Sequence, residues 1–356
     1  MSDDRNISSP VYGGGAREGG TSRRSVLSGI SAALCVSAAH AAPAPFQWKS
    51  LTIITSTGAG GTYDLLARLV ARHMPKYLPG NPTAIVQNMP GGGNVIATNY
   101  MYNNALKDGT VIAVINDAIP LHQVIDGRGV RFDADKFNWL GSPGDRNSVT
   151  FAWHTSGIKT IEDVMRREVA LGGTGVGSSI VIYPTAMNKV LGTKFKIVLG
   201  YRSSSEVFLA MERGEIAARS VGLTSVLAEY PDWISEKKIN FLVQLGPKRD
   251  SMLPDVPLLT ELAKTEEQRQ ILSLISAPTL LGQPYLAPPG VPQERVAILR
   301  AAFASTMRDP GFTADISRIS YGAVSLTGEE VARFVHQTVM TPADIVTKVR
   351  AVIGSA

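Results

Sequence analysis

Two glycine runs, Gly58-Ala59-Gly60-Gly61 and Gly91-Gly92-Gly93, each lie between a short apolar run and a longer amphipathic run. Glycine has no Cβ, so the backbone at such a turn can take a positive φ and come close to a bound group. The helix predicted after each run points its free N–H groups and the positive end of its dipole into the same space. The pair therefore indicates a site that holds an anion with backbone amides.

Strand-like and helix-like runs alternate around these glycines. The short apolar runs at 51–55, 84–87 and 111–115 predict strands, because they are rich in β-branched residues and end in turns. The runs at 64–74 and 95–105 carry apolar side chains at helical spacing and predict helices. This order implies a parallel sheet, whose ligands bind beyond the carboxyl ends of the strands, where both glycine runs lie.

The alternation restarts near residue 150. Strands are predicted at 149–153, 169–171, 196–199 and 241–245, and helices at 160–167, 180–191 and 204–213. A third glycine loop spans 172–179. We therefore predict an α/β protein of two lobes with a ligand cleft between them, in which 43–151 and 241–356 form the first lobe and 152–240 the second.

The last third of the chain contains many prolines. The stretches 253–257 and 286–292 are predicted as ordered turns, because prolines fix their backbone angles. Two amphipathic helices are predicted to follow, at 293–307 and 328–351.

The N-terminal segment has the features of an export signal. Arg23 and Arg24 precede an apolar stretch from Val26 to Ala39, and Ala39-His40-Ala41 matches a small-residue cleavage site. The paired arginines resemble a twin-arginine signal, with general secretory export left open. We expect residues 1–41 to be removed near Ala41, which gives a periplasmic protein. The only cysteine, Cys35, would be lost with this signal.

Composition excludes several classes of function. The net charge is +5 and the lysines and arginines are scattered, so no nucleic-acid-binding surface is predicted. The sequence has no phosphate-binding P-loop, no zinc motif and no serine-hydrolase motif. We therefore expect no metal, no cofactor and no enzymatic activity, since the required clusters of side chains are missing.

Three charged residues have two interpretations each. Asp64 stands at the start of a predicted helix, where an acid satisfies free N–H groups, but it could also contact a ligand or act as a base. Arg202 and Arg219 follow strand-like runs. Either could clamp a carboxylate through two hydrogen bonds, or form an ordinary ion pair.

A series of motifs in order along the chain resembles the substrate-binding proteins of tripartite tricarboxylate transporters, the TctC or Bug family. The glycine cluster followed by T-D-x-x-A-R corresponds to residues 60–68, N-R-P-G-A-G-G to 88–94, P-D-G-Y-T to 107–110, G-x-G-S-S to 175–179, and the two proline stretches to 253–257 and 287–292. The likeness covers about 46–356. The chain departs from the family at Ser56, Met89 and the Ile180-Val181 region, which bears on the choice of ligand.

The resemblance implies the two-lobed type II fold of periplasmic binding proteins, the Venus-flytrap fold. It also implies that a carboxylate is held by the two glycine loops of the first lobe, with the third loop closing from the second. The candidate ligand-binding residues are Thr57, Gly58, Ala59, Gly60, Gly61, Tyr63, Asp64, Gly91, Gly92, Gly93, Asn94, Gly175, Gly177, Ser178, Ser179 and Arg202.

We expect a monomeric exported receptor for a small organic carboxylate, which can be a di-, tri- or aromatic acid. The resemblance implies that it delivers this acid to the membrane permease subunits of a tripartite tricarboxylate transporter. One alternative is a partner that presents the ligand to a membrane sensor. Another is a periplasmic enzyme that uses Asp64 as its base. The residues do not name the acid, because the geometry of the cleft decides it.

Overall fold

The computed structural model describes residues 46–144, 147–319 and 325–353. The export signal predicted for 1–41, with Cys35, lies outside these residues. Residues 45–356 form one compact unit, and this unit contains a six-stranded and a five-stranded sheet. We call the part built on the six-stranded sheet the first lobe and the part built on the five-stranded sheet the second lobe.

The first sheet has the order β11-β4-β10-β3-β1-β2. Its strands are β1 (Ser50–Thr55), β2 (Thr83–Asn88), β3 (Val111–Val114), β4 (Asn138–Ser142), β10 (Tyr285–Ala287) and β11 (Leu326–Thr327). Strands β2 and β3 pair in parallel with β1, as the glycine-loop pattern predicts. The antiparallel β10 then joins β3 to β4.

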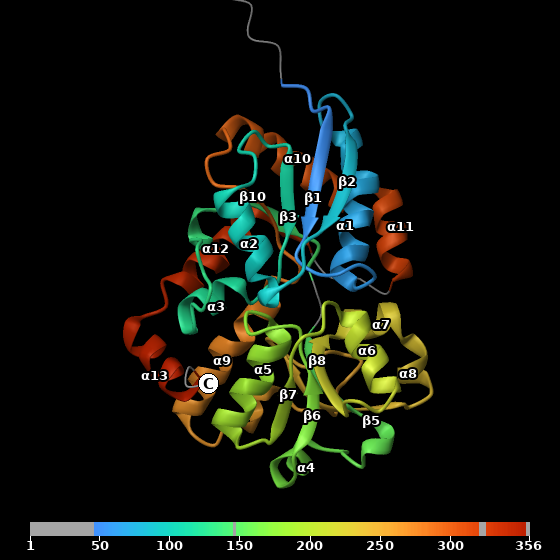
Figure 1. Ribbon diagram of the computed structural model, residues 1–356, viewed down its shortest axis with the longest axis vertical. Helices are drawn as coiled ribbons and strands as arrows, with labels where there is room; N and C mark the ends of the chain where they lie inside the picture. The colour runs from blue at the N-terminus through green and yellow to red at the C-terminus, as the bar shows by residue number, and fades with distance from the viewer. Residues whose placement is uncertain (1–45, 145–146, 320–324, 354–356) are drawn as a thin grey trace, which may run out of the picture. The chain divides into compact units, whose positions relative to one another are not determined.

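Helices cover both faces of the first sheet. They are α1 (Thr62–His73), α2 (Val95–Asn103), α3 (Ile119–Ile125), α10 (Gln293–Met307), α11 (Pro310–Arg318) and α12 (Gly328–Val339). Side chains alternate along β1, so Ile53 packs with α1, α10 and α11 while Ile54 packs with α2 and α12. Helices α1 and α11 lie side by side next to β1 and β2 (Figure 1). The central strands β1 and β3 are therefore covered on both faces, whereas the edge strand β2 leaves Thr83, Ile85 and Gln87 exposed.

The second sheet has the order β7-β6-β8-β5-β9. Its strands are β5 (Ser148–Trp153), β6 (Val169–Gly172), β7 (Phe195–Val198), β8 (Ala218–Gly222) and β9 (Ile239–Leu245). The helices near it are α4 (Ile161–Arg166), α5 (Ser179–Ala186), α6 (Ser204–Glu212), α7 (Leu223–Glu229), α8 (Pro231–Ser235), α9 (Glu266–Ser276) and α13 (Ala343–Ile353). Apolar residues of α3 also pack into the second-lobe core beside α5, α9 and α13, so α3 contacts both lobes.

Several expected boundaries differ from the structure. Strands β5 and β9 both pair in the second sheet, so the divisions placed at 151 and 241 cut through them. The helix predicted over 328–351 is two helices, α12 and α13, since Pro342 cannot donate a backbone hydrogen bond between them. The turn predicted at 286–292 begins inside β10, whose residues are fully buried.

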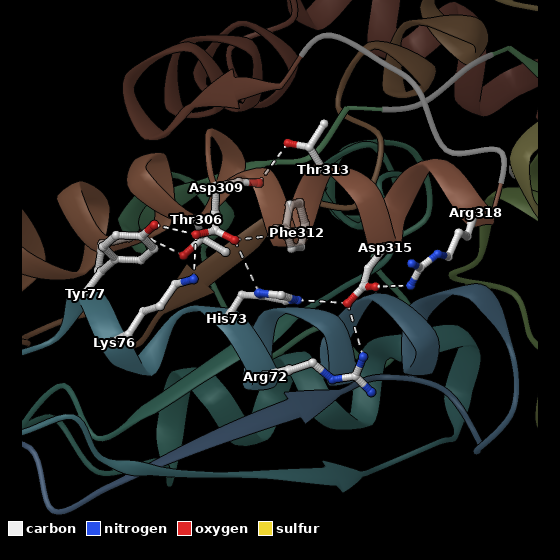
Figure 2. Close-up of polar contacts among 11 residues, drawn as sticks. Arg72, His73, Lys76, Tyr77, Thr306, Asp309, Phe312, Thr313, Asp315 and Arg318 are labelled. Carbon is white, nitrogen blue, oxygen red and sulfur yellow. Dashed lines mark hydrogen bonds and ion pairs between the residues drawn. The ribbon is translucent and has the colours of Figure 1, made fainter.

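A polar cluster joins α1 to α11 on the first lobe (Figure 2). Asp309 caps α11 by accepting a hydrogen bond from the Phe312 N–H at 2.9 Å. The same carboxylate contacts Lys76 at 2.5 Å, and the Tyr77 hydroxyl donates to it at 2.6 Å. These bonds, with that from Lys76 the strongest, hold the pKa of Asp309 well below its usual range. His73 lies between Asp309 and Asp315 in this cluster.

We expect Asp309→Asn to lower the stability of the protein at neutral pH. Asparagine still caps α11, so the change removes the charge and spares the cap. A carboxyl whose folded pKa is lowered stabilises the protein above its unfolded pKa and loses that contribution as the pH falls through the folded value. Urea unfolding at pH 7, 4 and 3 gives the free energy of unfolding of each protein. The difference between the unaltered protein and Asp309→Asn should become smaller as the pH falls. A difference that grows below pH 4 would contradict this account.

Candidate functional site

A small polar cavity of about 50 Å³ lies where strand ends of both lobes meet. Eight of the described residues that line it carry a hydroxyl: Thr57, Tyr63, Ser148, Thr174, Ser178, Ser179, Ser204 and Ser225. The lining also includes Asn94, Asn116, Asp117 and Gln283, with no lysine or arginine among the described residues. The site therefore offers many neutral donors, and its one lining carboxylate can accept hydrogen bonds.

Helix N-termini from both lobes converge on this cavity. Asn94 is the N-cap of α2, and Ser178 is the N-cap of α5. Neither N-cap side chain makes a capping hydrogen bond to its own helix. Tyr63 of α1 and Ser204 of α6 line the cavity from the first turns of their helices. The positive dipole ends of α2 and α5, one from each lobe, make the cavity favourable for an anion.

A second, larger cavity of about 270 Å³ adjoins the polar cavity and shares Thr57, Asn94 and Thr174 with it. The glycine run 91–93 lines it on the first lobe, and Tyr201 and Arg202 line it on the second. Arg202 thus belongs to the site, but at its outer part. The Asn94 side-chain oxygen is buried and accepts no hydrogen bond within the described residues.

The two lobes touch through backbone at the glycine loops. Gly93 has φ +63°, and a Cβ built there would lie 2.6 Å from both the Gly175 oxygen and the Gly177 nitrogen. Only glycine permits so close an approach. Gly175 and Gly177 therefore contribute to the interlobe contact, and neither is among the residues that line the polar cavity.

Hydrogen bonds also join the lobes around the first glycine loop. The Gly58 N–H donates to the Arg202 oxygen at 3.0 Å, and the Ser205 hydroxyl donates to the Gly60 oxygen at 2.9 Å. The Asn116 amide donates to the Ser179 hydroxyl at 3.1 Å. The conformation described is thus one in which the lobes are in contact over the cleft.

Thr62, the first residue of α1, makes the shortest of these bonds. Its hydroxyl lies 2.7 Å from the Ser225 hydroxyl and 2.9 Å from a carboxylate oxygen of Glu229, both on α7 of the second lobe. Burial raises the pKa of Glu229, and the charge of Arg219 opposes that rise. A carboxylate of the protein itself therefore occupies the N-terminus of α1.

The Asp64 carboxylate is hydrogen-bonded by the protein itself. Its oxygens accept hydrogen bonds from the Gly60 N–H at 3.0 Å, from Arg68 at 3.0 Å twice, and from Asn88 at 2.9 Å. Burial acts against ionisation, but these bonds outweigh it and lower the pKa of Asp64. The residue is not among those that line either cavity. Asp64 thus links the first glycine loop to Asn88, the last residue of β2, which precedes the second glycine loop.

The predicted residues therefore divide into groups. Thr57, Tyr63, Asn94, Ser178 and Ser179 line the polar cavity, and Gly91, Gly92, Gly93 and Arg202 line its larger neighbour. The first loop differs from expectation: the amides of Gly58 and Gly60 bind protein acceptors, Ala59 is exposed, and Gly61 is the N-cap of α1. In this conformation, those two amides are already engaged and offer nothing to a ligand.

Sequence reasoning missed several lining residues. Asn116 and Asp117 follow β3, so their place at a strand end was a usable signal. Ser148 and Ser225 gave no such signal, because antiparallel pairing and a short helix bring them to the cavity. Arg219, in contrast, was a candidate for ligand binding in the sequence but lines neither cavity. It is fully buried, its guanidinium stacks 3.8 Å from the Phe208 ring, and burial lowers its pKa to about 10, so it does not reach a ligand.

Comparison with known proteins identifies the family. The family model of the tripartite tricarboxylate transporter family receptor, TctC, matches residues 66–350. The chain belongs to this family. A curated relative of the receptor, the UPF0065 protein in the gbd 5′ region of Cupriavidus necator, is 25% identical over 332 residues, which are 90% of this chain and 95% of that protein.

Solved structures show that the receptor has the two-lobed fold of periplasmic binding proteins, as the sequence predicts. The periplasmic binding protein BugD has a TM-score of 0.68 and 19% identity, covering 86% of this chain and 99% of BugD. MatC from Rhodopseudomonas palustris, with bound malate, has a TM-score of 0.68 and 18% identity, covering 85% of this chain and 100% of MatC.

The described residues contain neither a membrane-spanning helix nor a metal-binding cluster. None of the receptor's helices within 46–144, 147–319 and 325–353 is long and apolar enough to cross a bilayer. Over the same ranges, no three histidine, cysteine or acidic side chains are grouped closely enough to hold a metal ion.

Proposed function

We propose that the receptor captures a small organic carboxylate in the polar cavity and delivers it, in the periplasm, to the membrane permease of a tripartite tricarboxylate transporter. The convergence of helix N-termini from both lobes on one hydroxyl-lined cavity is the observation that carries this proposal. Such an arrangement stabilises an anion without a cationic side chain. Because residues of both lobes line the cavity, binding and lobe closure are coupled.

The two adjoining cavities suggest how a diacid would lie. The polar cavity has room for only a few atoms, about 50 Å³, which suits one carboxylate group. The remainder of the acid would extend past Thr57 and Asn94 into the larger cavity. A second carboxylate would then come near the glycine run 91–93 and Arg202, where an arginine can donate two hydrogen bonds. The malate bound by MatC, a structural neighbour, agrees with an acid of this size.

An enzymatic role for Asp64 has less support. A general base must reach a proton of the substrate, within hydrogen-bond distance or through one water. Asp64 instead accepts four hydrogen bonds from the protein and does not line the cavities. The sensor-partner alternative shares the proposed binding site, so it differs only in the membrane protein that the closed receptor contacts.

Isothermal titration of the refolded, ligand-stripped receptor with malate, succinate, citrate and benzoate tests the proposal. We expect saturable binding of at least one of these acids, with a stoichiometry of one per chain. Native mass spectrometry of the protein as purified from the periplasm should show the same class of acid bound. If the folded protein binds no acid and carries none from the cell, the proposed function is wrong.

A further inference from the structure

Asn116, which follows β3 and lines the polar cavity, forms four side-chain hydrogen bonds that involve both lobes. The residue is buried. Its Oδ1 atom accepts from the backbone N–H groups of Ala118 and Ser179, each at 3.1 Å. Its Nδ2 atom donates to the Ser179 hydroxyl oxygen at 3.1 Å and to the Tyr63 hydroxyl oxygen at 3.2 Å. Both hydrogens of the amide are therefore used.

The two backbone donors fix the orientation of the Asn116 amide. A backbone N–H only donates, so the side-chain atom that faces Ala118 and Ser179 N–H must be the oxygen. Turning the amide over would place its NH2 group against both donors and would lose both of these bonds. The NH2 group of Asn116 therefore faces the Ser179 hydroxyl, as a donor that cannot accept.

This donor determines the direction of the Ser179 hydroxyl. An amide nitrogen accepts no hydrogen bond, so the Ser179 oxygen receives one from Asn116 and the hydroxyl hydrogen must point elsewhere. Within the described residues, the Ser179 hydroxyl makes no other hydrogen bond. Ser179 is the first residue of α5 and lines the polar cavity. Its hydrogen is therefore available to a group in the cavity, and a carboxylate oxygen is a strong acceptor for it.

The other serines that line the cavity from the second lobe differ in this respect. The Ser178 hydroxyl donates to the Gly175 oxygen at 2.6 Å, so its hydrogen is already engaged. Ser204 is similar to Ser179, because its hydroxyl oxygen lies 3.3 Å from Nη2 of Arg219, which only donates. Ser179 and Ser204, each the first residue of its helix, are thus held as donors by protein groups behind them.

The bonds between Asn116 and Ser179 form only when the lobes are in contact. Asn116 belongs to the first lobe and Ser179 to the second, and two hydrogen bonds join them. One of these bonds uses the Ser179 N–H, so in this conformation that residue offers a ligand its hydroxyl and not its amide. Closure of the lobes therefore also turns the Ser179 hydroxyl into a donor for the cavity.

We propose that Asn116 is the positioning residue that makes the closed polar cavity selective for an anion. It holds the Ser179 hydroxyl with its hydrogen directed away from Asn116, so a carboxylate meets a donor that needs no reorientation. The role of Asn116 rests on the proposed carboxylate function. It adds to that function the residue that decides whether Ser179 presents a donor or an acceptor.

Asn116→Asp exchanges the donor for an acceptor with almost no change in size. One carboxylate oxygen can still accept from the two backbone N–H groups, while the other oxygen replaces the NH2 group. The Ser179 hydroxyl then donates to that oxygen, and its lone pairs face the cavity. Titration calorimetry at pH 7 uses whichever of malate, succinate, citrate and benzoate binds the unaltered protein most tightly. The affinity should fall at least about 100-fold, because a hydrogen bond to a charged group is lost and a negative charge is added.

Ser179→Ala separates the hydrogen bond from the added charge. In the unaltered protein this change removes the donor and should weaken acid binding at least about tenfold. In the Asn116→Asp protein the hydroxyl is already turned away, so Ser179→Ala should change the affinity by less than about twofold. If the added charge alone weakened binding, Ser179→Ala would reduce the affinity by the same factor in both proteins. Equal factors would therefore overturn the proposal.

Asn104→Asp is the matched control for charge. It adds the same charge at an exposed residue that follows α2 and lines neither cavity, and should bind the acid within about twofold of the unaltered protein. Circular dichroism melts verify that each variant is folded. Ser179→Ala alone also tests the proposal, since unchanged affinity would overturn it even if Asn116→Asp did not fold.

The unaltered protein distinguishes the two levels of failure. If it binds none of the four acids, the proposed function fails and the role of Asn116 falls with it. If it binds an acid and the folded Asn116→Asp protein binds that acid equally well, the carboxylate function stands and only the role of Asn116 is overturned.

Discussion

Gly93→Ala should weaken acid binding by at least about 100-fold, or roughly 2.7 kcal/mol, while the protein remains folded. An alanine Cβ at this position would lie 2.6 Å from the Gly175 oxygen and the Gly177 nitrogen. Both atoms belong to the backbone of the opposite lobe, so no side chain can rotate to make room. The lobes must separate to relieve the clash, and an acid then loses the contacts that depend on both lobes.

Gly192→Ala is the matched control for Gly93→Ala. Gly192 has φ +75°, close to the +63° of Gly93, so an alanine suffers similar backbone strain at either position. A Cβ on Gly192 would meet nothing within 4 Å. Titration calorimetry with the best acid of the panel should show near-normal affinity for Gly192→Ala. Equal affinity of the two variants would mean that closure across Gly93 and Gly175 does not matter for binding.

Arg219→Met should destabilise the protein by roughly 3 kcal/mol, a loss typical when one of two interacting charges is removed from a protein interior. The guanidinium is fully buried, stacks on Phe208 and donates to the Ser204 oxygen at 3.0 Å. Methionine keeps much of the volume and removes the charge. Glu229 would then lose the positive charge that opposes the rise in its pKa.

A double-mutant cycle isolates the electrostatic part of this loss. Glu229→Gln removes the acid but keeps an oxygen that can accept from Thr62, which donates at 2.9 Å. If the two charges stabilise each other, Arg219→Met combined with Glu229→Gln should lose less stability than the sum of the single changes. Urea unfolding at pH 7 gives all four free energies of unfolding. Additive losses would show that packing on Phe208, and not charge, accounts for the effect of Arg219.

Local patterns were enough to predict the frame of the first lobe. The β-branched runs that became β1, β2 and β3 end in glycine turns, and their parallel pairing follows from the helices between them. Strand β10 could not be predicted this way. It has only three residues and is followed by two prolines, and its burial between β3 and β4 depends on tertiary pairing.

The candidate site was only partly visible in the sequence. Glycine composition located the loops, but it did not separate Gly93, whose Cβ would strike the opposite backbone, from Gly92, whose Cβ would find ordinary contacts at 3.6 Å. Asp64 could be read as an acid at a helix start, which matches its hydrogen bonds to Gly60 and Arg68.

The most direct test of the carboxylate account is a crystal structure of the receptor with the tightest-binding acid of the panel. The account predicts a carboxylate group in the polar cavity, within hydrogen-bond distance of first-turn groups of α2 and α5, near Asn94, Ser178 and Ser179. The lobes should be in contact through Gly93 and Gly175, as described. An acid bound outside this cavity, or inside it with the glycine loops apart, would contradict the account.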